Sequence, residues 1–541
     1  MLRRFCTTAV VIILVTFAAG AQSQPDFSAA RFKAHVTFLA DDLLEGREAG
    51  TRGHEIAARY VAAEFAQLGV APGAAGGSYF QPVALLEVRR TGSAWLTMKT
   101  SSGSQRFAQA HDVLLGGSPL GGESDVKGEV VFVGYGITDA SLGMDDYKGL
   151  DVRGRVVVAL AAPVPGIDSE IAAHLLTQQQ RIAAEHGAVG FLGVQTHGAA
   201  RVRPFEMLAA HADTPSTTWV RKDGTPFDRL HGMKASALLG PKAAAALFKG
   251  APRSLEEVLN EAERPEGRPA GFALKASVEL RVATKTRRYS SPDVVGMIEG
   301  SDPALKQEYV ALMGHADHIG IEPTGTGDRI NNGALDNGAG VATLLEVARA
   351  FTTSTARPKR SVLIVANTAE EKGLLGAESF ANNPPVPIDR IVAAIDLDMP
   401  LLLYDFTDAV AYGAGHSTVE RAFQAAGAQM GVTLSPDPMP EQTIFVRSDH
   451  YAMAKVGVPA VMLATGMANG GKEAWDSFLR KQYHHPDDDL SLPIHWTAGA
   501  RFAELNYRAV RILADSPERP LWYAGDYFGN LFAPSATKAT K

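Results

Sequence analysis

The chain has 541 residues, more than one hydrophobic core usually serves, so we expect at least two domains. Its hydrophobic and charged fractions, 46% and 21%, are those of an ordinary globular protein and exclude a disordered, collagen-like or multi-span membrane chain. Acidic side chains outnumber basic ones by 59 to 52, and no basic run with interleaved aromatic residues is present, so we expect no nucleic-acid partner.

Residues 1–21 predict a secretory signal peptide. Arg3 and Arg4 precede an apolar run from about Thr7 to Ala19, and the small residues Ala19-Gly20-Ala21 form a cleavage pattern. The alternative is an uncleaved anchor, but the run is shorter than the roughly 20 residues of a membrane-spanning helix. We therefore expect a secreted or periplasmic protein with no stable membrane insertion after cleavage.

The only cysteine of the chain, Cys6, lies inside this predicted signal peptide. The mature protein would then have no thiol, which excludes a disulfide framework. Any metal site would have to be built from His, Asp and Glu side chains.

Two helices are expected at the start of the mature chain. Residues 27–68 carry apolar side chains at helical spacing, interrupted by the glycine-containing stretch 44–53. The second helix is expected over Glu55–Leu68.

An inserted module is predicted over residues 119–285. It combines short β-type runs with a helical pattern, at Val130–Val133, Val156–Leu160 and Ile171–His186. This pattern of short strands and helices differs from the sequence pattern on either side of the segment. We therefore expect residues 25–118 and 286–541 to form one domain around a β-rich insert.

From Pro292 onwards, strands and helices alternate. Apolar runs typical of buried strands occur at Tyr309–Met313, Val362–Ala366, Ile391–Leu397 and Ala460–Leu463. A helix with one apolar face is expected over Val341–Phe351. The predicted fold is α/β, with a mostly parallel mixed sheet flanked by helices. In such sheets ligands bind beyond the carboxyl ends of the strands.

Polar side chains follow three of these strands at the point where each strand ends. The motifs are Gly314-His315-Ala316-Asp317-His318, Glu370-Glu371 and Asp396-Leu397-Asp398. Each motif alone is more often a solvated loop, but their recurrence at one edge of a sheet favours a site. Two further motifs carry candidate ligands. Asp336 lies in the first, where the alternative role is that of a helix cap. His484 lies in the second, before a Pro-Asp turn that is typical of a surface loop.

Five of these side chains supply two imidazoles and three carboxylates, namely His315, Asp336, Glu371, Asp398 and His484. This set suits two zinc ions that share a bridging carboxylate. A pair of metal ions can activate a water molecule and polarise a carbonyl in the same site. The sequence therefore predicts metal-assisted hydrolysis with two Zn²⁺ per chain.

The motifs at 314–320, 332–340, 370–377, 396–399, 447–451 and 483–488 resemble those of the co-catalytic zinc exopeptidases of metallopeptidase family 28. The resemblance is strong over about residues 290–500 and implies the phosphorylase/hydrolase-like fold of that family. Glu45-Gly46-Arg47 looks like part of the family's leading helices. Asp293 stands where the family more usually has Asn, at a position that carries no predicted ligand.

The resemblance also implies the role of each residue. His315 and Asp398 would hold one zinc ion, Glu371 and His484 the other, and Asp336 would bridge them. Glu370 would be the general base, and Asp317 would orient His315. Asp449 and Asp488 are weaker supporting candidates, and either Tyr451 or Tyr483 would stabilise the oxyanion.

The sequence of the insert at Val131–Ile137 and Tyr147–Asp151 resembles that of the protease-associated domain found in many such peptidases. Inserts of this kind carry no catalytic residues and usually shape or cover the mouth of the site. A role as a spacer is equally compatible with the sequence.

The favoured function is that of a secreted aminopeptidase that acts on peptide substrates. A carboxypeptidase would need a cationic residue at the site, and Arg447 keeps this alternative open. Glutaminyl cyclase activity is disfavoured, because those relatives generally lack such an insert. A silent receptor or binding protein would lack ligands or the base, and all six positions are filled here. The sequence does not determine the oligomeric state.

Overall fold

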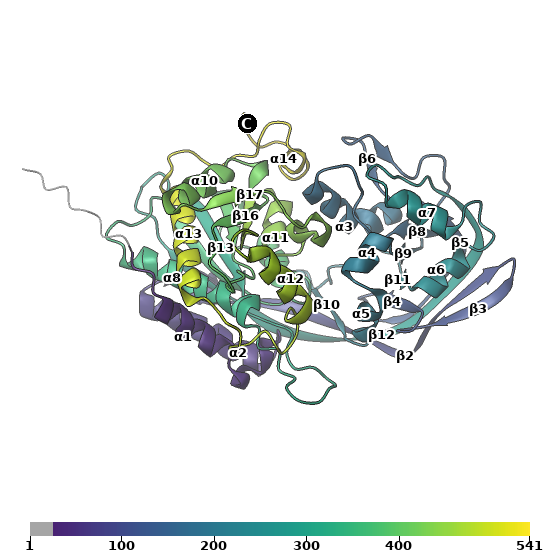
Figure 1. The fold of residues 1–541 in the computed structure, drawn as a ribbon, viewed down its shortest axis with the longest axis horizontal. Coiled ribbons are helices and arrows are strands. Elements are labelled where there is room, and N and C mark those ends of the chain that lie inside the picture. The colour runs from purple at the N-terminus through teal and green to yellow at the C-terminus, as the bar shows by residue number, and fades with distance from the viewer. Residues whose placement is uncertain (1–24) are drawn as a thin grey trace, which may run out of the picture.

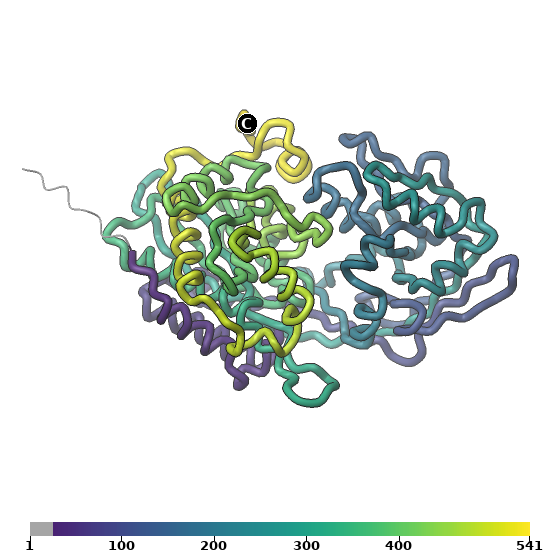
Figure 2. The backbone as a smooth tube through the Cα atoms, in the orientation of Figure 1, coloured from purple at the N-terminus to yellow at the C-terminus, as the bar shows by residue number. Residues whose placement is uncertain are grey.

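The structure, a computed structural model, describes residues 25–541, so the predicted signal peptide lies outside the described residues. Two lobes lie side by side, and long strands run from one lobe into the other (Figure 1). The tube in Figure 2 shows that the N-terminal and C-terminal parts of the described chain both belong to the same lobe, here called the peptidase lobe. The other lobe, here called the insert lobe, holds helices α3 to α7.

Helices of the peptidase lobe come from both ends of the chain. They are α1 (Ala29–Leu39), α2 (Arg52–Leu68), α8 (Ala339–Thr353), α9 (Leu375–Asn382), α10 (Val419–Met430), α11 (His450–Lys455), α12 (Gly471–Lys481), α13 (Trp496–Asp515) and α14 (Tyr527–Phe532). Helix α2 begins at a Thr51 cap, whose hydroxyl accepts from the His54 N–H, and ends at Gly69 with φ of 75°. The two helices predicted before residue 69 are confirmed.

The sheet of the peptidase lobe is mixed, with a parallel centre. Its strands lie in the order β17 (Thr433–Ser435), β16 (Asp408–Tyr412), β18 (Ala460–Thr465), β15 (Ile391–Asp396), β13 (Tyr309–His315), β14 (Ser361–Asn367) and β12 (Phe272–Ile298). The four strands β18, β15, β13 and β14 are parallel, whereas β12 runs antiparallel to β14 and β16 runs antiparallel to β18. The predicted fold class is confirmed.

Helices cover both faces of this sheet, because successive side chains of a strand point to opposite faces. On β13, Val310 and Leu312 pack in the core beneath α1, α2, α8 and α13, whereas Ala311 and Met313 pack in the core beneath α9 and α11. All four side chains are fully buried. The strands are therefore buried on both faces, which explains their nearly continuous apolar sequences.

Two long strands join the lobes. β2 (Phe80–Thr100) pairs antiparallel with β12 along nearly its whole length, and in Figure 1 the pair runs along the lower side of the insert lobe towards the peptidase lobe. These strands were not predicted, and their pairing joins two segments that lie far apart in the sequence. A single sheet therefore connects the two lobes.

The insert lobe has its own hydrophobic core and is itself α/β rather than β-rich. Its strands are β3 (Gly103–Ala108), β4 (Val113–Gly117), β5 (Gly122–Phe132), β8 (Val156–Leu160), β9 (Gly190–Val194), β10 (Ser216–Trp219) and β11 (Ala235–Leu239), and its helices are α3 (Ser169–Glu185), α4 (His197–Val202), α5 (Phe205–Ala210), α6 (Pro241–Leu247) and α7 (Leu255–Ala262). The core includes Leu96 and Phe107 at one end and Val282 at the other. The lobe thus begins before predicted residue 119 and ends near residue 285.

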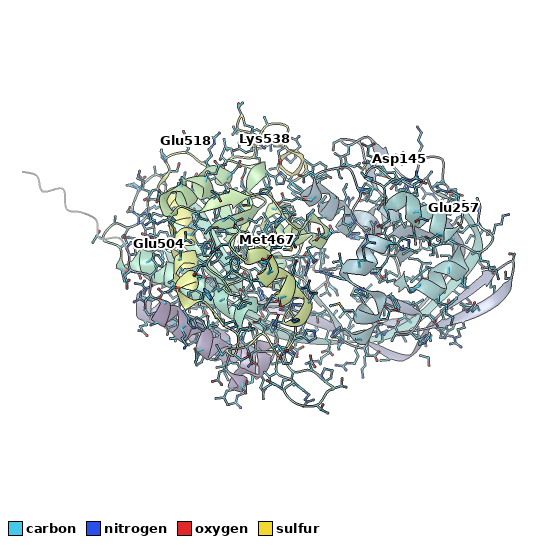
Figure 3. The ribbon with its side chains drawn as sticks, in the orientation of Figure 1. Asp145, Glu257, Met467, Glu504, Glu518 and Lys538 are labelled. Atoms are coloured by element: carbon cyan, nitrogen blue, oxygen red, sulfur yellow. The ribbon has the colours of Figure 1, made fainter. Side chains whose placement is uncertain are left out.

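Charged side chains occur on the surface of both lobes. In Figure 3, Asp145 and Glu257 lie on the insert lobe, and Glu504, Glu518 and Lys538 lie on the peptidase lobe. Within residues 25–541, every helix is too short or too polar to cross a lipid bilayer.

Candidate active site

Three neighbouring parallel strands deliver the predicted ligands to one edge of the sheet. His315 ends β13, Glu370 and Glu371 follow β14, and Asp398 follows β15. Asp336 precedes α8, and His484 follows α12. The structure brings all five predicted ligands and the predicted base together.

Two groups of ligand atoms face the two oxygens of Asp336. His315 Nε2 lies 3.3 Å from Asp336 Oδ1 and 3.1 Å from Asp398 Oδ1. His484 Nε2 lies 3.4 Å from Asp336 Oδ2 and 3.0 Å from Glu371 Oε2. Asp336 therefore lies between the two pairs of side chains that the resemblance assigns to separate ions.

The donor set fits zinc in chemistry and in spacing. Nitrogen and oxygen ligands bind Zn²⁺ at about 2.0–2.2 Å, so two ligands of one tetrahedral ion lie roughly 3.4 Å apart. The four separations given above are close to this value. Ligand atoms of His315, Asp336 and Glu371 also lie within 4.8 Å of one another. These side chains are therefore able to hold metal ions without large rearrangement.

Glu370 lines the same pocket but lies farther from the imidazoles than the predicted ligands do. Its Oε2 is 4.0 Å from His315 Nε2, and its backbone N–H donates to Asp317 Oδ1 at 3.1 Å. Burial raises the pKa of Glu370 well above its usual value; His315 opposes this shift, and Glu371 adds to it. A buried excess of carboxylates over imidazoles favours cations at this site.

Asp317 has two contacts at the site. Its carboxylate lies 3.9 Å from His315 Nδ1, which is ion-pair range, but that nitrogen is closer to the Asp317 carbonyl oxygen, at 3.2 Å. The same carboxylate accepts from the Glu370 N–H. Asp317 therefore lies beside the imidazole, and its carboxylate holds the backbone N–H of Glu370.

Further side chains hold the predicted ligands in place. Asp488 accepts from the N–H groups of Leu335 and Asp336, each at 3.0 Å, and Ser448 Oγ donates to Asp398 Oδ2 at 2.7 Å. His318 Nδ1 lies 2.6 Å from Glu371 Oε1, a contact that sequence reasoning missed. Asp449 is fully buried, and neither of its carboxylate oxygens has a hydrogen-bond partner among the described residues.

Arg47 ties the leading segment to the loops that carry the ligands. It is 1% exposed, and its guanidinium donates to the carbonyls of Ala316 at 3.1 Å and Gly333 at 3.0 Å, and also to those of Leu39 and Asn332. Ala316 follows His315, and Gly333 precedes Asp336. The Glu45-Gly46-Arg47 motif thus has a structural role at the site.

The two tyrosines considered for the oxyanion point in different directions. Tyr483 stacks on His484, with ring centroids 3.8 Å apart, and lines the pocket. The hydroxyl of Tyr451 lies 2.6 Å from His174 Nδ1 on α3 of the insert lobe. Tyr451 therefore joins the two lobes, and the hypothesis that it stabilises an oxyanion is wrong. Tyr483 remains the candidate for that role.

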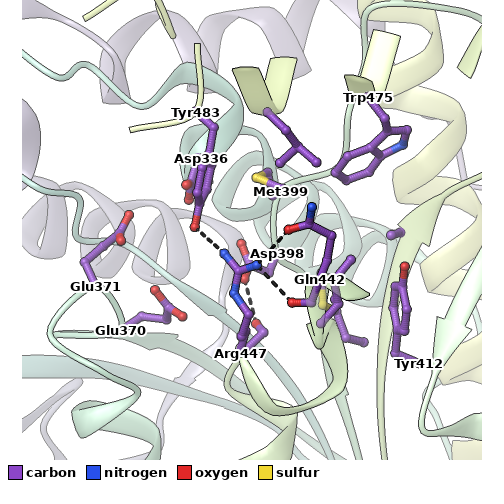
Figure 4. Close-up of a pocket in the computed structure, with 15 residues that line it drawn as sticks. Asp336, Glu370, Glu371, Asp398, Met399, Tyr412, Gln442, Arg447, Trp475 and Tyr483 are labelled. Carbon is purple, nitrogen blue, oxygen red and sulfur yellow. Dashed lines mark hydrogen bonds between the residues drawn. The ribbon is translucent and has the colours of Figure 1, made fainter. Parts of the chain in front are cut away.

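A pocket extends from the predicted ligands. Figure 4 shows Glu370 and Glu371 on one side of Arg447, and Met399, Trp475 and Tyr412 on the other. The part beyond Arg447 is lined mainly by large apolar and aromatic side chains. It could accept an apolar substrate group next to the predicted metal centre.

A second cluster joins the lobes at some distance from this pocket. His416 Nε2 lies 2.6 Å from Glu170 Oε2 of α3, and His416 Nδ1 lies 2.6 Å from Asp526 Oδ2, so both ring nitrogens face carboxylates. Burial alone would lower the pKa of His416, but Asp526 and Glu170 raise it to about 10. The cluster is therefore an ion-paired contact between the lobes.

Asp293 is fully buried below the loop that carries Glu370. Its Oδ1 accepts from the Thr368 N–H at 2.9 Å, its Oδ2 has no partner among the described residues, and burial raises its pKa to about 8. An aspartate in the unfolded chain titrates near 3.9. The folded state therefore loses stability as the pH rises from about 4 to about 8.

We expect Asp293→Asn to remove this loss, because asparagine fills the same space without ionising. The free energy of unfolding of the variant should exceed that of the unsubstituted protein by a few kcal/mol at pH 8, at roughly 1.4 kcal/mol per pH unit above about 4. Urea unfolding of both proteins from pH 4 to pH 9 measures this difference. If the free energies of unfolding of the two proteins changed with pH in the same way, the raised pKa of Asp293 would be contradicted.

The sheet and the ligand cluster define an α/β protein with a candidate metal centre of imidazoles and carboxylates. Residues 293–510 match the model of Peptidase family M28. This range contains all five predicted ligands and the predicted base.

One solved structure shares the fold. The aminopeptidase from Aneurinibacillus sp. strain AM-1 superposes with a TM-score of 0.52 at 18% identity, over 93% of this chain and 97% of that chain. The zinc aminopeptidase from Bacillus subtilis gives a TM-score of 0.43 at 15% identity, over 90% of this chain and 95% of that chain.

Curated relatives match shorter segments. The aminopeptidase NAALADL1 of Mus musculus is 32% identical over 163 residues, which are 29% of this chain and 20% of that protein. A vacuolar membrane protease of Verticillium alfalfae is 48% identical over 52 residues, 10% of this chain and 5% of that protein. The chain therefore spans only a small part of these relatives.

Proposed function

We propose that the chain is a zinc-dependent exopeptidase, specifically an aminopeptidase with two zinc ions. The observation that carries this proposal is the position of Asp336, whose two oxygens face His315 with Asp398 on one side and His484 with Glu371 on the other. The family match to residues 293–510 supports peptide-bond hydrolysis.

In this proposal His315 and Asp398 would hold one zinc ion, Glu371 and His484 would hold the other, and Asp336 would supply a carboxylate oxygen to each group. When bound, the two ions would lower the pKa of a water molecule and polarise the scissile carbonyl. Glu370 takes a proton from the water at its carboxylate and passes it to the leaving amine. Asp317 positions Glu370 through the backbone N–H, and Tyr483 is placed to hydrogen-bond developing negative charge.

Cleavage from the N-terminal end of the substrate is supported by the acidic character of the site, because carboxylates attract a free N-terminal ammonium group. The protein from Aneurinibacillus that shares the fold is described as an aminopeptidase. A carboxypeptidase is the second candidate, favoured by the guanidinium of Arg447 in the pocket. A silent receptor would be expected to lack a ligand or the base, and those positions are occupied by suitable side chains.

Hydrolysis of a substrate panel tests the proposal. The metal-replete protein should release free N-terminal residues from aminoacyl p-nitroanilides, and a chelator should abolish this activity, which added zinc then restores. Cleavage of only N-blocked peptides, from their C-terminal end, would instead establish the carboxypeptidase. A protein that binds no zinc would overturn both.

Export from the cytoplasm is proposed on the sequence of residues 1–21 alone. The site can be built without cysteine, which is compatible with an oxidising compartment. The oligomeric state is left open.

A further inference from the structure

The loop between β14 and α9, residues 368–374, carries the predicted base Glu370 and the predicted ligand Glu371 and is here called the base loop. The N–H groups of Gly373 and Leu374 close it by donating to the carbonyl of Glu370, at 2.7 and 2.8 Å. The position of Glu370 therefore depends on where the end of the base loop is held.

The base loop has a backbone conformation that needs support from its surroundings. Ala369 and Leu374, which lie on either side of the two glutamates, have φ of 55° and 63°. Residues other than glycine rarely adopt this left-handed conformation, and it persists where the surrounding structure holds it. We therefore searched for contacts that hold both ends of the loop.

A hairpin of the insert lobe, residues 216–229, lies against the base loop and α9. It starts with β10, which pairs with β2 and contacts α9, and it turns at residues 221–225. In Figure 1, β10 lies where the two lobes meet. The insert lobe therefore reaches the segment that directly follows Glu370.

Apolar side chains of the hairpin and of the base loop share a small core. Trp219 of β10 is 3% exposed and belongs to the same buried cluster as Ala369 and Leu375. The ring of Phe227 stacks on Trp219, with centroids 5.7 Å apart. Because Ala369 directly precedes Glu370, this packing holds the beginning of the base loop.

Polar groups of the hairpin hold the end of the base loop and the helix that follows. Arg229 Nη2 donates to the Gly373 carbonyl at 2.5 Å and lies 3.7 Å from Glu378 Oε2 of α9. Trp219 Nε1 donates to the same oxygen of Glu378 at 3.2 Å. The other oxygen of Glu378 pairs with Lys455 Nζ of α11 at 2.6 Å. Glu378 thus joins the hairpin to two helices of the peptidase lobe.

We propose that this hairpin of the insert lobe positions the general base, with Trp219 and Arg229 as positioning residues that hold the base loop at both ends. This inference rests on the proposed peptidase function. Neither residue is among the described residues that line the pocket, so both act through the loop that carries Glu370. The insert lobe is then needed for the geometry of the site, which a spacer or a cover would not be.

Arg229→Met tests the proposal at a half-exposed position, where 49% of the side chain is accessible and the substitution should leave the fold intact. The variant loses the bond to Gly373, so Glu370 is held less firmly. At saturating zinc we expect kcat for an aminoacyl p-nitroanilide to fall about tenfold with little change in KM, because a small misplacement of a reacting group is costly.

Trp219→Phe tests the other positioning residue. Phenylalanine keeps an aromatic ring in the small core but lacks the N–H that donates to Glu378. We expect kcat to fall about threefold, the cost of one hydrogen bond.

Arg221→Met is the matched control, because Arg221 lies on the same hairpin and is exposed. Its guanidinium donates to the Pro226 carbonyl at 3.3 Å and lies over the rings of Trp219 and Phe227, all within the hairpin. Its kcat should equal that of the unsubstituted protein. A loss as large as that in Arg229→Met would show that the bond to the base loop is not the cause, and would overturn the proposal.

A double-mutant cycle separates positioning of the base from a general loss of structure. With Glu370→Gln in place there is no base to position, so adding Arg229→Met should leave the residual kcat unchanged. An equal fall of kcat in both backgrounds would overturn the proposal.

Hydrogen exchange gives a readout that does not depend on turnover. The N–H groups of residues 373–376 each donate to a carbonyl of residues 368–370, so their exchange rates report opening of the base loop. In Arg229→Met these groups should exchange about tenfold faster, whereas Arg221→Met should leave them unchanged.

The outcomes distinguish this proposal from the proposed function. Chelator-sensitive hydrolysis with kcat unchanged in both Arg229→Met and Trp219→Phe would overturn the positioning role and leave the peptidase intact. If the unsubstituted protein cleaves no substrate but the base loop exchanges faster in Arg229→Met, the hold of the hairpin on the loop stands and the proposed chemistry fails.

Discussion

Glu370→Gln is expected to lower kcat by about 10²–10⁴-fold while zinc remains bound. Glutamine fills the same space but cannot accept a proton, and removal of a general base typically costs this factor. The side chain lines the pocket 4.0 Å from His315 Nε2 and is not needed by either group of ligand atoms around Asp336. Initial rates test the loss of activity, and the zinc content per chain, measured on the same preparation, tests whether zinc remains bound.

Glu371→Gln is the matched control, because it makes the same chemical change one residue away. Its Oε2 lies 3.0 Å from His484 Nε2, so this variant should lose zinc as well as activity. If Glu370→Gln also lost zinc, Glu370 would have to be a ligand. If Glu370→Gln kept full activity, a different group would have to accept the proton.

The strands that carry the site could be predicted from the sequence because they are buried on both faces. Tyr309–Met313 and Ile391–Leu397 are apolar at nearly every position, and the structure has strands there that end within two residues of the prediction. Since the carboxyl ends of parallel neighbours meet at one edge, the strand positions placed His315, Glu371 and Asp398 at the same edge of the sheet, whereas the pairing of His315 with Asp398 came from the resemblance. The predicted ligands could therefore be grouped before their geometry was known.

Features that depend on side-chain direction between distant segments could not be predicted. The sequence motif that contains Tyr451 also contains Ser448, yet Ser448 points to Asp398 whereas Tyr451 points to His174 of the insert lobe. The contact between His318 and Glu371 joins two loops, and nothing in the local pattern of either loop indicates it. The long pair of β2 and β12 was missed because its residues are separated by an insert whose fold had to be known first.

Arg47→Met is expected to lower the free energy of unfolding by about 3–5 kcal/mol and to weaken zinc binding. The guanidinium is buried and donates to four backbone carbonyls, three of which lie in the loops that carry His315 and Asp336. Methionine fills much of the space but leaves these acceptors without donors, and each unsatisfied buried group costs about 1–3 kcal/mol. Burial lowers the pKa of Arg47 to about 10, with Asp488 opposing this shift, so the side chain is still charged at neutral pH.

Loss of Arg47 should act on the site through the backbone, since Arg47 is not a predicted zinc ligand. Urea unfolding and zinc titration measure the two effects, and Arg52→Met, at an exposed position on α2, should change stability by less than about 0.5 kcal/mol. If Arg47→Met lost stability but bound zinc as tightly as the unsubstituted protein, the loops would hold their ligands without this anchor. If both properties were unchanged, water would have to satisfy the carbonyls, and the Glu45-Gly46-Arg47 segment would have no role in the metal centre.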